Sequence, residues 1–244
     1  MTRRRVLLFS NSTNPEARYL AHGAAELLDF LGPVRRLLFV PFALHDRAAY
    51  AAKVAGALGE LGIELQALTA DAAGARALAG AEAVFVGGGN TFRLLRALQD
   101  SALLAPLRER ALAGLPYVGS SAGSNLAGPT IKTTNDMPIV FPHGFEALGL
   151  VPFQLNPHYL DAEPASRHMG ETREERLREF LEENSRPVVG LREGCWIRRE
   201  GAAITLGGVS TTGGAAARVF RRAGEPEERP SGASLADLGD VGSD

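Results

Sequence analysis

The chain has 244 residues, of which 45% are hydrophobic, so it is long enough to bury the core of one large domain or of two small ones. Its formal net charge of −2 gives no general electrostatic case for binding nucleic acid or an anionic membrane, and no apolar run approaches the length of a membrane span. The single cysteine, Cys195, excludes a disulfide framework and a multi-cysteine metal site, and it favours a reducing, cytoplasmic setting.

Short apolar runs alternate with segments of helical periodicity through the first half of the chain. This alternation is typical of βαβ units and predicts an α/β fold with a central, mostly parallel sheet flanked by helices. The expected strands are residues 6–9, 37–42, 63–68, 83–86 and 115–118. The expected helices are residues 15–31, 47–61, 71–78 and 91–113, and Asn14-Pro15 is a favourable pair for the start of the first helix.

The second half of the chain has a less regular pattern. Residues 151–155 are expected to form a strand, residues 171–184 a charged helix, and residues 188–206 several strands with a turn at Glu200-Gly201. There is no internal repeat and no linker, so residues 1–223 are expected to form a single catalytic domain. Residues 224–244 are rich in Gly, Pro, Ser and acidic residues, and we expect them to be largely disordered.

The stretch PYVGSSAGSNLAG, residues 116–128, contains one serine that fits a nucleophile elbow. An elbow turns sharply from a strand into a helix and needs small residues two places before and two places after the reactive side chain. Ser121 has Gly119 and Gly123 at these places, whereas Ser120 and Ser124 do not have this frame. Ser121 is therefore the candidate nucleophile, although the same pattern is also compatible with an ordinary Gly/Ser turn.

A serine hydroxyl needs a general base, and His158 is the best placed of the histidines. It follows the apolar run VPFQL in the motif Asn156-Pro157-His158-Tyr159, where a strand is expected to end, and sites in open α/β sheets lie at such ends. The other histidines are expected to be packing, surface or loop residues: His22, His45, His143 and His168.

Two acidic residues could orient the histidine. Glu193 lies in GLREGCW, just after an apolar run and before a glycine, which again is the expected end of a strand. Asp136 lies in the loop TTNDMPI, where it could equally form a turn. The order Ser121, His158, Glu193 differs from the Ser, acid, His order of α/β-hydrolases and disfavours that fold.

A second glycine cluster, VGGGNT at residues 86–91, ends a predicted strand and begins a predicted helix. It lacks the G-x-G-x-x-G spacing, and no acidic residue follows at the ribose-binding distance, so a dinucleotide site is not expected. Its bare backbone could donate an N–H to an oxyanion, together with the N–H of Ala122, which follows the candidate nucleophile.

Six segments resemble the peptidase E family of α-aspartyl dipeptidases, serine peptidase family S51, in order and spacing: SNST (10–13), VGGGNTF (86–92), GSSAGSNLAGPTIKTTNDMPIV (119–140), LNPHY (155–159), GETREER (170–176) and GLREGCW (190–196). The resemblance implies a fold like the class I glutamine amidotransferases and hydrolysis of dipeptides with N-terminal aspartate, without a metal or other cofactor.

Carried over by position, the resemblance implies that Ser121 is the nucleophile and His158 the base, with Gly88 and Ala122 as oxyanion donors. It allows Glu193 or Asp136 as the third member of the triad, and we favour Glu193. The family often has a bulky aromatic residue immediately before the nucleophile, where this chain has Ser120, so the pocket wall is expected to differ. Past residue 208 the similarity fades.

A substrate aspartate brings a carboxylate that is costly to bury without a cation. Arg173 in GETREER is our first candidate for this cation because a guanidinium matches a carboxylate in two hydrogen bonds, and Lys132 is the second. The alternative for Arg173 is pairing with nearby glutamates on an exposed helix. Asn90 is a further candidate for substrate contact, and Asp136, if it is not the triad acid, could accept the α-ammonium group.

Two other functions remain compatible with the sequence. One is a cyanophycinase-like peptidase on the same scaffold that acts on β-aspartyl bonds. The other is a non-catalytic binder of acidic dipeptides, which retention of the serine, the histidine and both acids disfavours. The expected partners are small acidic dipeptide substrates, without nucleic acid or membrane, and the protein is expected to be a monomer or a homodimer.

Overall fold

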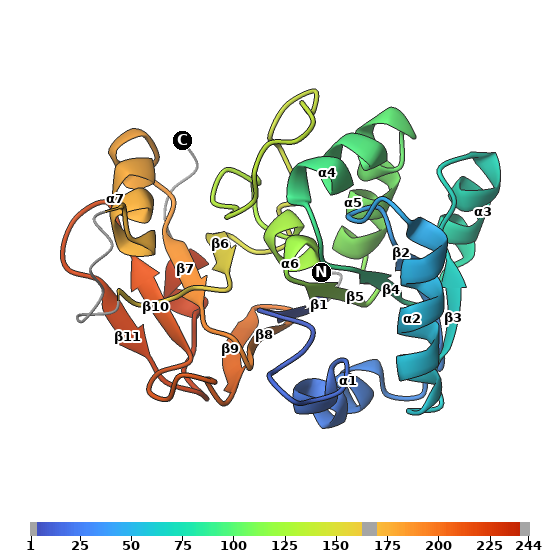
Figure 1. The fold of residues 1–244 in the computed structure, drawn as a ribbon, viewed down its shortest axis with the longest axis horizontal. Coiled ribbons are helices and arrows are strands. Elements are labelled where there is room, and N and C mark those ends of the chain that lie inside the picture. Colours follow the sequence, from blue (N-terminus) through green and yellow to red (C-terminus); the bar gives the residue numbers. More distant parts are fainter. Residues whose placement is uncertain (1–3, 163–169, 240–244) are drawn as a thin grey trace.

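A seven-stranded sheet forms the centre of the protein in a computed structural model that describes residues 4–162 and 170–239 (Figure 1). Its first five strands in spatial order are parallel, and the last two are antiparallel to their neighbours. The order is β3 (Glu64–Ala67), β2 (Arg36–Val40), β4 (Val84–Val86), β5 (Tyr117–Ser120), β1 (Arg5–Phe9), β8 (Cys195–Glu200) and β9 (Ala203–Gly208). The predicted α/β fold with a central, mostly parallel sheet is confirmed.

Helices cover both faces of this sheet because its central strands are apolar on both sides. In β1, Val6 and Leu8 join the core on one face, whereas Leu7 and Phe9 join the core on the other. The first face carries α3 (Ala72–Gly80), α4 (Thr91–Asp100), α5 (Leu104–Leu112) and α6 (Ala122–Leu126), and the second carries α1 (Ala24–Leu31) and α2 (Arg47–Gly59). None of the helices in the described part of the chain is long and apolar enough to span a membrane.

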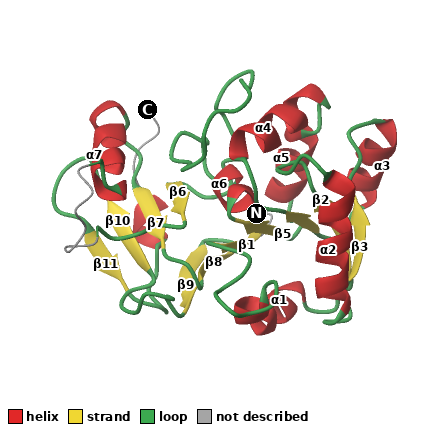
Figure 2. Cartoon of the chain, in the orientation of Figure 1, coloured by secondary structure: helices red, strands yellow, loops and turns green. Residues whose placement is uncertain are grey.

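A smaller sheet lies beside the first and carries α7 (Arg173–Glu183) (Figure 2). Its order is β11 (Glu227–Arg229), β10 (Ala217–Phe220), β7 (Val188–Leu191) and β6 (Gln154–Pro157). Leu177 and Leu181 of α7 pack with Val188 and Phe220 on one face of this sheet. Side chains of its other face belong to the same core cluster as those of the large sheet, so the two sheets share one core.

Two predicted helices differ from the structure. The first begins at Ala24, after a short 3₁₀ turn at Ala21–Gly23, because Leu20 has a left-handed backbone (φ 55°) and the Asn14 side chain bonds to Asn11 instead of capping a helix. The predicted helix 91–113 is divided into α4 and α5 where Ala102 has φ 55°. Residues between 101 and 103 therefore turn the chain.

The end of the chain is more ordered than its composition predicts. Within residues 224–239, β11 pairs with β10, and a 3₁₀ turn follows at Ala236–Gly239. Leu235 and Leu238 are fully buried in the shared core, and these two apolar residues anchor an otherwise polar segment. The prediction of disorder for residues 240–244 lies outside the described residues.

Candidate active site

Ser121 occupies a sharp turn between β5 and α6. Its backbone has φ 52° and ψ −110°, an arrangement rare for a residue with a side chain. A Cβ on Gly119 would lie 2.6 Å from the Gly123 carbonyl oxygen, and one on Gly123 would lie 2.1 Å from the carbonyl oxygen of Val86. The turn therefore requires glycine at both positions, and this steric requirement is the physical reason for the G-x-S-x-G pattern. By contrast, Ser120 is fully buried and points away from solvent.

His158 contacts Ser121 from the end of β6. The distance between His158 Nε2 and Ser121 Oγ is 2.8 Å. The base therefore lies within hydrogen-bond reach of the hydroxyl proton that it would remove. His158 itself has a left-handed backbone (φ 54°), which turns its ring toward the elbow immediately after Pro157.

Glu193, and not Asp136, contacts the histidine. The distance from Glu193 Oε1 to His158 Nδ1 is 2.5 Å, so the serine, imidazole and carboxylate form one hydrogen-bonded line. Glu193 follows β7, which pairs in parallel with β6, so the two strands deliver acid and base to the same edge of the small sheet. Both side chains are about one-third exposed. This geometry is that of a catalytic triad.

Asp136 lies at the N-terminus of α4. Its carboxylate accepts hydrogen bonds from the backbone N–H of Thr91 (2.7 Å) and from the hydroxyls of Thr91 (2.6 Å) and Thr134 (3.1 Å). The partial positive charge at a helix N-terminus stabilises a carboxylate there. Asp136 lines a small pocket together with Thr91, Ser121, Ala122, Asn125, Thr134, Asn135, Pro157 and His158.

The side chain of Asn90 is occupied by structural contacts. Its Oδ1 caps α4 by accepting from the Arg93 N–H (3.0 Å), and its Nδ2 donates to the Met137 carbonyl (2.8 Å). Asn90 thus holds the loop that carries Asp136 against α4. The predicted contact of Asn90 with substrate would require the loss of one of these bonds.

The two predicted oxyanion donors both adjoin Ser121. Ala122 provides the first N–H of α6, which has no acceptor within the helix. Gly88 lies so close that a Cβ on it would be 3.0 Å from Ser121 Cβ. The Gly88 N–H also faces Tyr50: burial raises the pKa of the Tyr50 phenol, whereas the Tyr19 hydroxyl and this N–H act in the opposite direction. The N–H of Gly88 therefore lies within electrostatic reach of the Tyr50 hydroxyl as well as close to Ser121.

Arg173 is the first residue of α7 and carries a half-buried guanidinium. Burial and the neighbouring Arg176 lower the pKa of Arg173, whereas the charge of Asp136 raises it, so Arg173 lies within electrostatic reach of the pocket. It forms no hydrogen bond or ion pair with any residue that the structure describes. Two glutamates near Arg173 pair with other arginines: Glu174 with Arg178 (2.9 Å), and Glu171 with Arg176 (3.4 Å). Lys132 is exposed and does not line the pocket.

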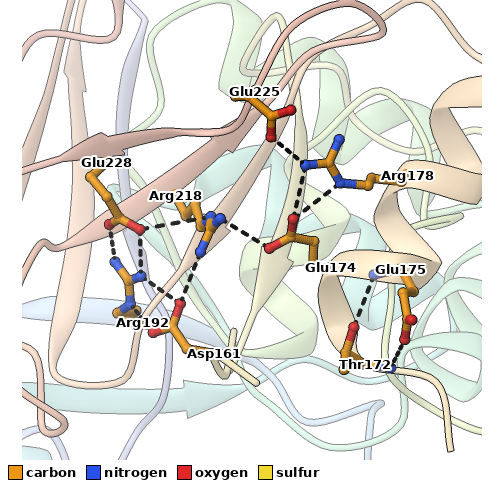
Figure 3. Close-up of polar contacts among 9 residues, drawn as sticks. All are labelled: Asp161, Thr172, Glu174, Glu175, Arg178, Arg192, Arg218, Glu225 and Glu228. Atoms are coloured by element: carbon orange, nitrogen blue, oxygen red, sulfur yellow. Dashed lines mark hydrogen bonds and ion pairs between the residues drawn. The ribbon is translucent and has the colours of Figure 1, made fainter. Parts of the chain in front are cut away.

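A network of charged side chains surrounds Arg192, the residue before Glu193 (Figure 3). Arg192 is 5% exposed and forms paired hydrogen bonds with Asp161 (both 2.8 Å) and with Glu228 of β11 (2.7 and 3.0 Å). Arg218 of β10 approaches Asp161 and Glu228 and forms an ion pair with Glu174 of α7 (3.0 Å). The network connects the loop after His158, the residue before Glu193, and α7, the helix that carries Arg173.

The other histidines that the structure describes, His22, His45 and His143, do not contact Ser121, His158 or Glu193. His45 is exposed, and His143 pairs with Asp100 (2.8 Å). His22 is packed edge-on against Phe9, and neither of its ring nitrogens has a hydrogen-bond partner within the described chain. His168 lies outside the described residues. No group of three or more His, Cys, Asp or Glu side chains in residues 4–162 and 170–239 could hold a metal ion.

Two residues at the site received no role from their sequence pattern. Ser10 and Asn11 follow β1 directly and contact the backbone near His158 and Glu193. Their position after a buried strand is a usable signal, because side chains at the carboxyl ends of parallel strands share one edge of the sheet.

Known proteins resemble this chain over most of its length. A family model described as Peptidase family S51 matches residues 6–207. The chain is 52% identical to peptidase E of Streptomyces coelicolor, over 97% of this chain and 95% of that protein. It is 49% identical to a Drosophila melanogaster protein named "probable alpha-aspartyl dipeptidase", over 96% of each. The solved structure of a peptidase from an acI-B1 Actinobacterium has the same fold, with a TM-score of 0.68 at 17% identity, covering 95% of this chain and 96% of that one.

Proposed function

This chain belongs to peptidase family S51 and is a serine peptidase, and from that premise we propose that it hydrolyses dipeptides with N-terminal aspartate through an acyl-enzyme. The observation that carries the proposal is the continuous line of hydrogen-bond contacts from Ser121 through His158 to Glu193, at 2.8 and 2.5 Å.

In the proposed acylation step, Ser121 Oγ attacks the peptide carbonyl while its proton moves to His158 Nε2. Glu193 holds the Nδ1–H tautomer and stabilises the imidazolium that forms. The N–H of Ala122, with Gly88 as the second donor, stabilises the negative oxygen of the tetrahedral intermediate. His158 then protonates the leaving amine, the C–N bond breaks, and the aspartyl group remains as an ester on Ser121.

In the proposed deacylation step, water replaces the leaving amino acid. His158 takes a proton from this water as its oxygen attacks the ester carbonyl, and the intermediate collapses by breaking the bond to Ser121 Oγ. His158 returns the proton to Ser121. The products are free aspartate and the second amino acid, and the enzyme is unchanged.

Recognition of the aspartate is assigned to the charges that flank the pocket. The substrate β-carboxylate pairs with Arg173, whose guanidinium has no ion pair within the described chain. The substrate α-ammonium group pairs with Asp136, which lines the pocket next to the nucleophile. This pairing requires a substrate with a free N-terminus, and it excludes peptides that have further residues before the aspartate.

The proposed setting is the reducing cytoplasm, since the one cysteine, Cys195, is buried and unpaired. The enzyme is proposed to act there as a monomer or homodimer on small acidic dipeptides.

The test of this function is hydrolysis of Asp-Leu compared with Glu-Leu, N-acetyl-Asp-Leu and β-Asp-Leu. We expect Asp-Leu to be cleaved with a kcat/KM at least about 100-fold higher than the other three. For N-acetyl-Asp-Leu this corresponds to one lost charge pair of roughly 3 kcal/mol, whereas Glu-Leu and β-Asp-Leu keep both charges but present the carboxylate and the scissile carbonyl in a different relative position. Preference for β-Asp-Leu would instead indicate a cyanophycinase-like activity. Binding of Asp-Leu without turnover would indicate a non-catalytic protein.

A further inference from the structure

The last residue of β1 and the two residues after it accept hydrogen bonds from the backbone of Ser121, of His158 and of the residue that follows Glu193. The Phe9 carbonyl accepts the backbone N–H of Ser121 (3.1 Å). Ser10 Oγ accepts the backbone N–H of His158 (2.9 Å). Asn11 Oδ1 accepts the backbone N–H of Gly194 (2.8 Å), the residue after Glu193.

The hydroxyl of Ser10 occupies the centre of this arrangement. Ser10 is fully buried, and its hydroxyl donates to the Leu191 carbonyl (2.8 Å) while it accepts from His158. Leu191 is the last residue of β7, two before Glu193. One hydroxyl thus bridges the backbone that carries the base and the backbone that carries the acid.

The backbone at His158 explains why such a bridge is needed. A left-handed conformation (φ 54°) is unfavourable for a residue with a side chain and persists only where the surroundings fix it. The N–H of His158 would lack its bond to Ser10 if the residue relaxed to an ordinary conformation. Its ring would then turn away from Ser121 or Glu193, because both contacts depend on the direction in which the backbone presents the imidazole.

We propose that Ser10 is a positioning residue of the active site, which holds His158 in its left-handed conformation and fixes the distance between the base and Glu193. This inference rests on the proposed triad. Ser10 does not touch the reacting atoms; it acts through the backbone of His158 and Leu191. It also assigns a role to the first residue of the SNST motif.

The test compares Ser10→Ala with Ser124→Ala. Each substitution removes one buried hydroxyl that lies near the carboxyl end of β1. Ser124 Oγ donates to the Phe9 carbonyl (2.7 Å) and contacts neither His158 nor Glu193. For Ser10→Ala we expect kcat on Asp-Leu to fall by about 10- to 100-fold with KM changed less than about twofold, because a small misplacement of a catalytic group costs rate and not binding. For Ser124→Ala we expect kcat to stay within about threefold of the unaltered enzyme, although both variants lose thermal stability.

A second readout reports on the base itself. In the unaltered protein the proton between His158 Nδ1 and Glu193 should give a resolved downfield signal in the ¹H NMR spectrum. A variant that is only less stable should still show this signal at temperatures below its melting temperature. We expect this signal to shift or broaden in Ser10→Ala and to persist in Ser124→Ala. Equal kcat in the two variants, or an unchanged signal in Ser10→Ala, would overturn the proposal.

If Ser10→Ala does not fold, hydrogen exchange in the unaltered protein decides the question. The His158 amide should be strongly protected although its side chain is partly exposed, and rapid exchange would contradict the proposed bond to Ser10. Ser121→Ala is measured in parallel. If that variant keeps full activity, the proposed serine mechanism fails, whereas the NMR and exchange results still report on Ser10.

Discussion

The two sides of the active site are built by different forces. On the side of the large sheet, the elbow at Ser121 and the end of β1 are held by buried hydrogen bonds and by close backbone contacts that only glycine permits. On the side of the small sheet, α7 presents Arg173 and is connected through Glu174 and Arg218 to a network of partly exposed ion pairs (Figure 3).

This difference separates chemistry from recognition. Catalysis requires atoms fixed to within a few tenths of an ångström, which close packing and short backbone hydrogen bonds provide. Recognition of one carboxylate requires a charge at the right place, which a helix held by ion pairs can supply. We therefore expect changes to the hydrogen-bonded line of Ser121, His158 and Glu193 and its buried supports to lower kcat. Changes to the charged side chains that flank the pocket, Arg173 and Asp136, should alter KM and the choice of substrate.

The largest expected effect is the loss of the nucleophile. Ser121→Ala should reduce kcat on Asp-Leu by about 10⁶-fold, the scale found when a triad serine is removed. Steady-state and single-turnover assays measure this loss. Ser120→Ala is the control, because that hydroxyl is fully buried and has no hydrogen-bond partner in the described chain, and its activity should be close to normal. Comparable losses in both variants would refute the assignment.

The next effect concerns the orienting acid. Glu193→Gln should lower kcat by about 10³- to 10⁴-fold with little change in KM, because an amide favours the wrong imidazole tautomer and cannot stabilise the imidazolium. Asp136→Asn is the matched change across the pocket. It should mainly raise KM, since Asp136 contacts Thr91 and Thr134 and not His158. If Asp136→Asn instead lowers kcat as much as Glu193→Gln, the triad acid is wrongly assigned.

A smaller and substrate-dependent effect is expected at Arg173. Arg173→Met should reduce kcat/KM for Asp-Leu by about 100-fold and for Asn-Leu by less than about fivefold, because only the first substrate loses a charge pair. The control is Arg176→Met on the same helix, whose exposed partner is Glu171. An equal reduction for both substrates would mean that Arg173 supports α7 and does not bind the aspartate.

Breaking the ion-pair network should have a weaker effect than removing Arg173. Arg218→Met removes the link to Glu174 (3.0 Å) and should raise KM for Asp-Leu by about two- to fivefold, the range expected for partly exposed ion pairs, with kcat retained. Arg221→Met, which removes two other ion pairs, with Glu227 and Asp237, should leave KM unchanged. A large fall in kcat for Arg218→Met would erase the distinction between the two sides.

The smallest expected effect concerns the stability of the protein and arises at His22, on the large-sheet side. Burial lowers the pKa of His22 below its usual 6.5, while the charge of Glu193 acts in the opposite direction. Because the folded protein favours neutral His22, the free energy of unfolding should fall as the pH drops below 6.5, where the unfolded chain binds a proton first. His22→Leu should weaken this pH dependence in urea unfolding, whereas His45→Gln at an exposed site should not. An unchanged pH dependence in His22→Leu would indicate that His22 is not buried in the folded protein.

Local patterns in the sequence were sufficient to predict the sheet and the elbow. Alternating apolar runs and helical periods identify βαβ units because each element buries its own apolar residues, and this pattern is visible without the fold. The glycines around Ser121 identify the turn because their requirement is steric and involves residues two places away. The boundaries of the helices were less predictable. The division between α4 and α5 at Ala102 and the late start of α1 after Leu20 depend on left-handed backbone conformations, which the residue types alanine and leucine do not indicate.

Only the tertiary structure decided which distant residues meet. The sequence allowed Glu193 or Asp136 as the partner of His158, and the parallel pairing of β6 with β7 brings Glu193 to Nδ1 while Asp136 binds the N-terminus of α4. The sequence also assigned no role to Ser10, which meets His158 across 148 residues of chain. Such contacts depend on strand order and register. These are set by the packing of the whole core, and no short stretch of sequence contains them.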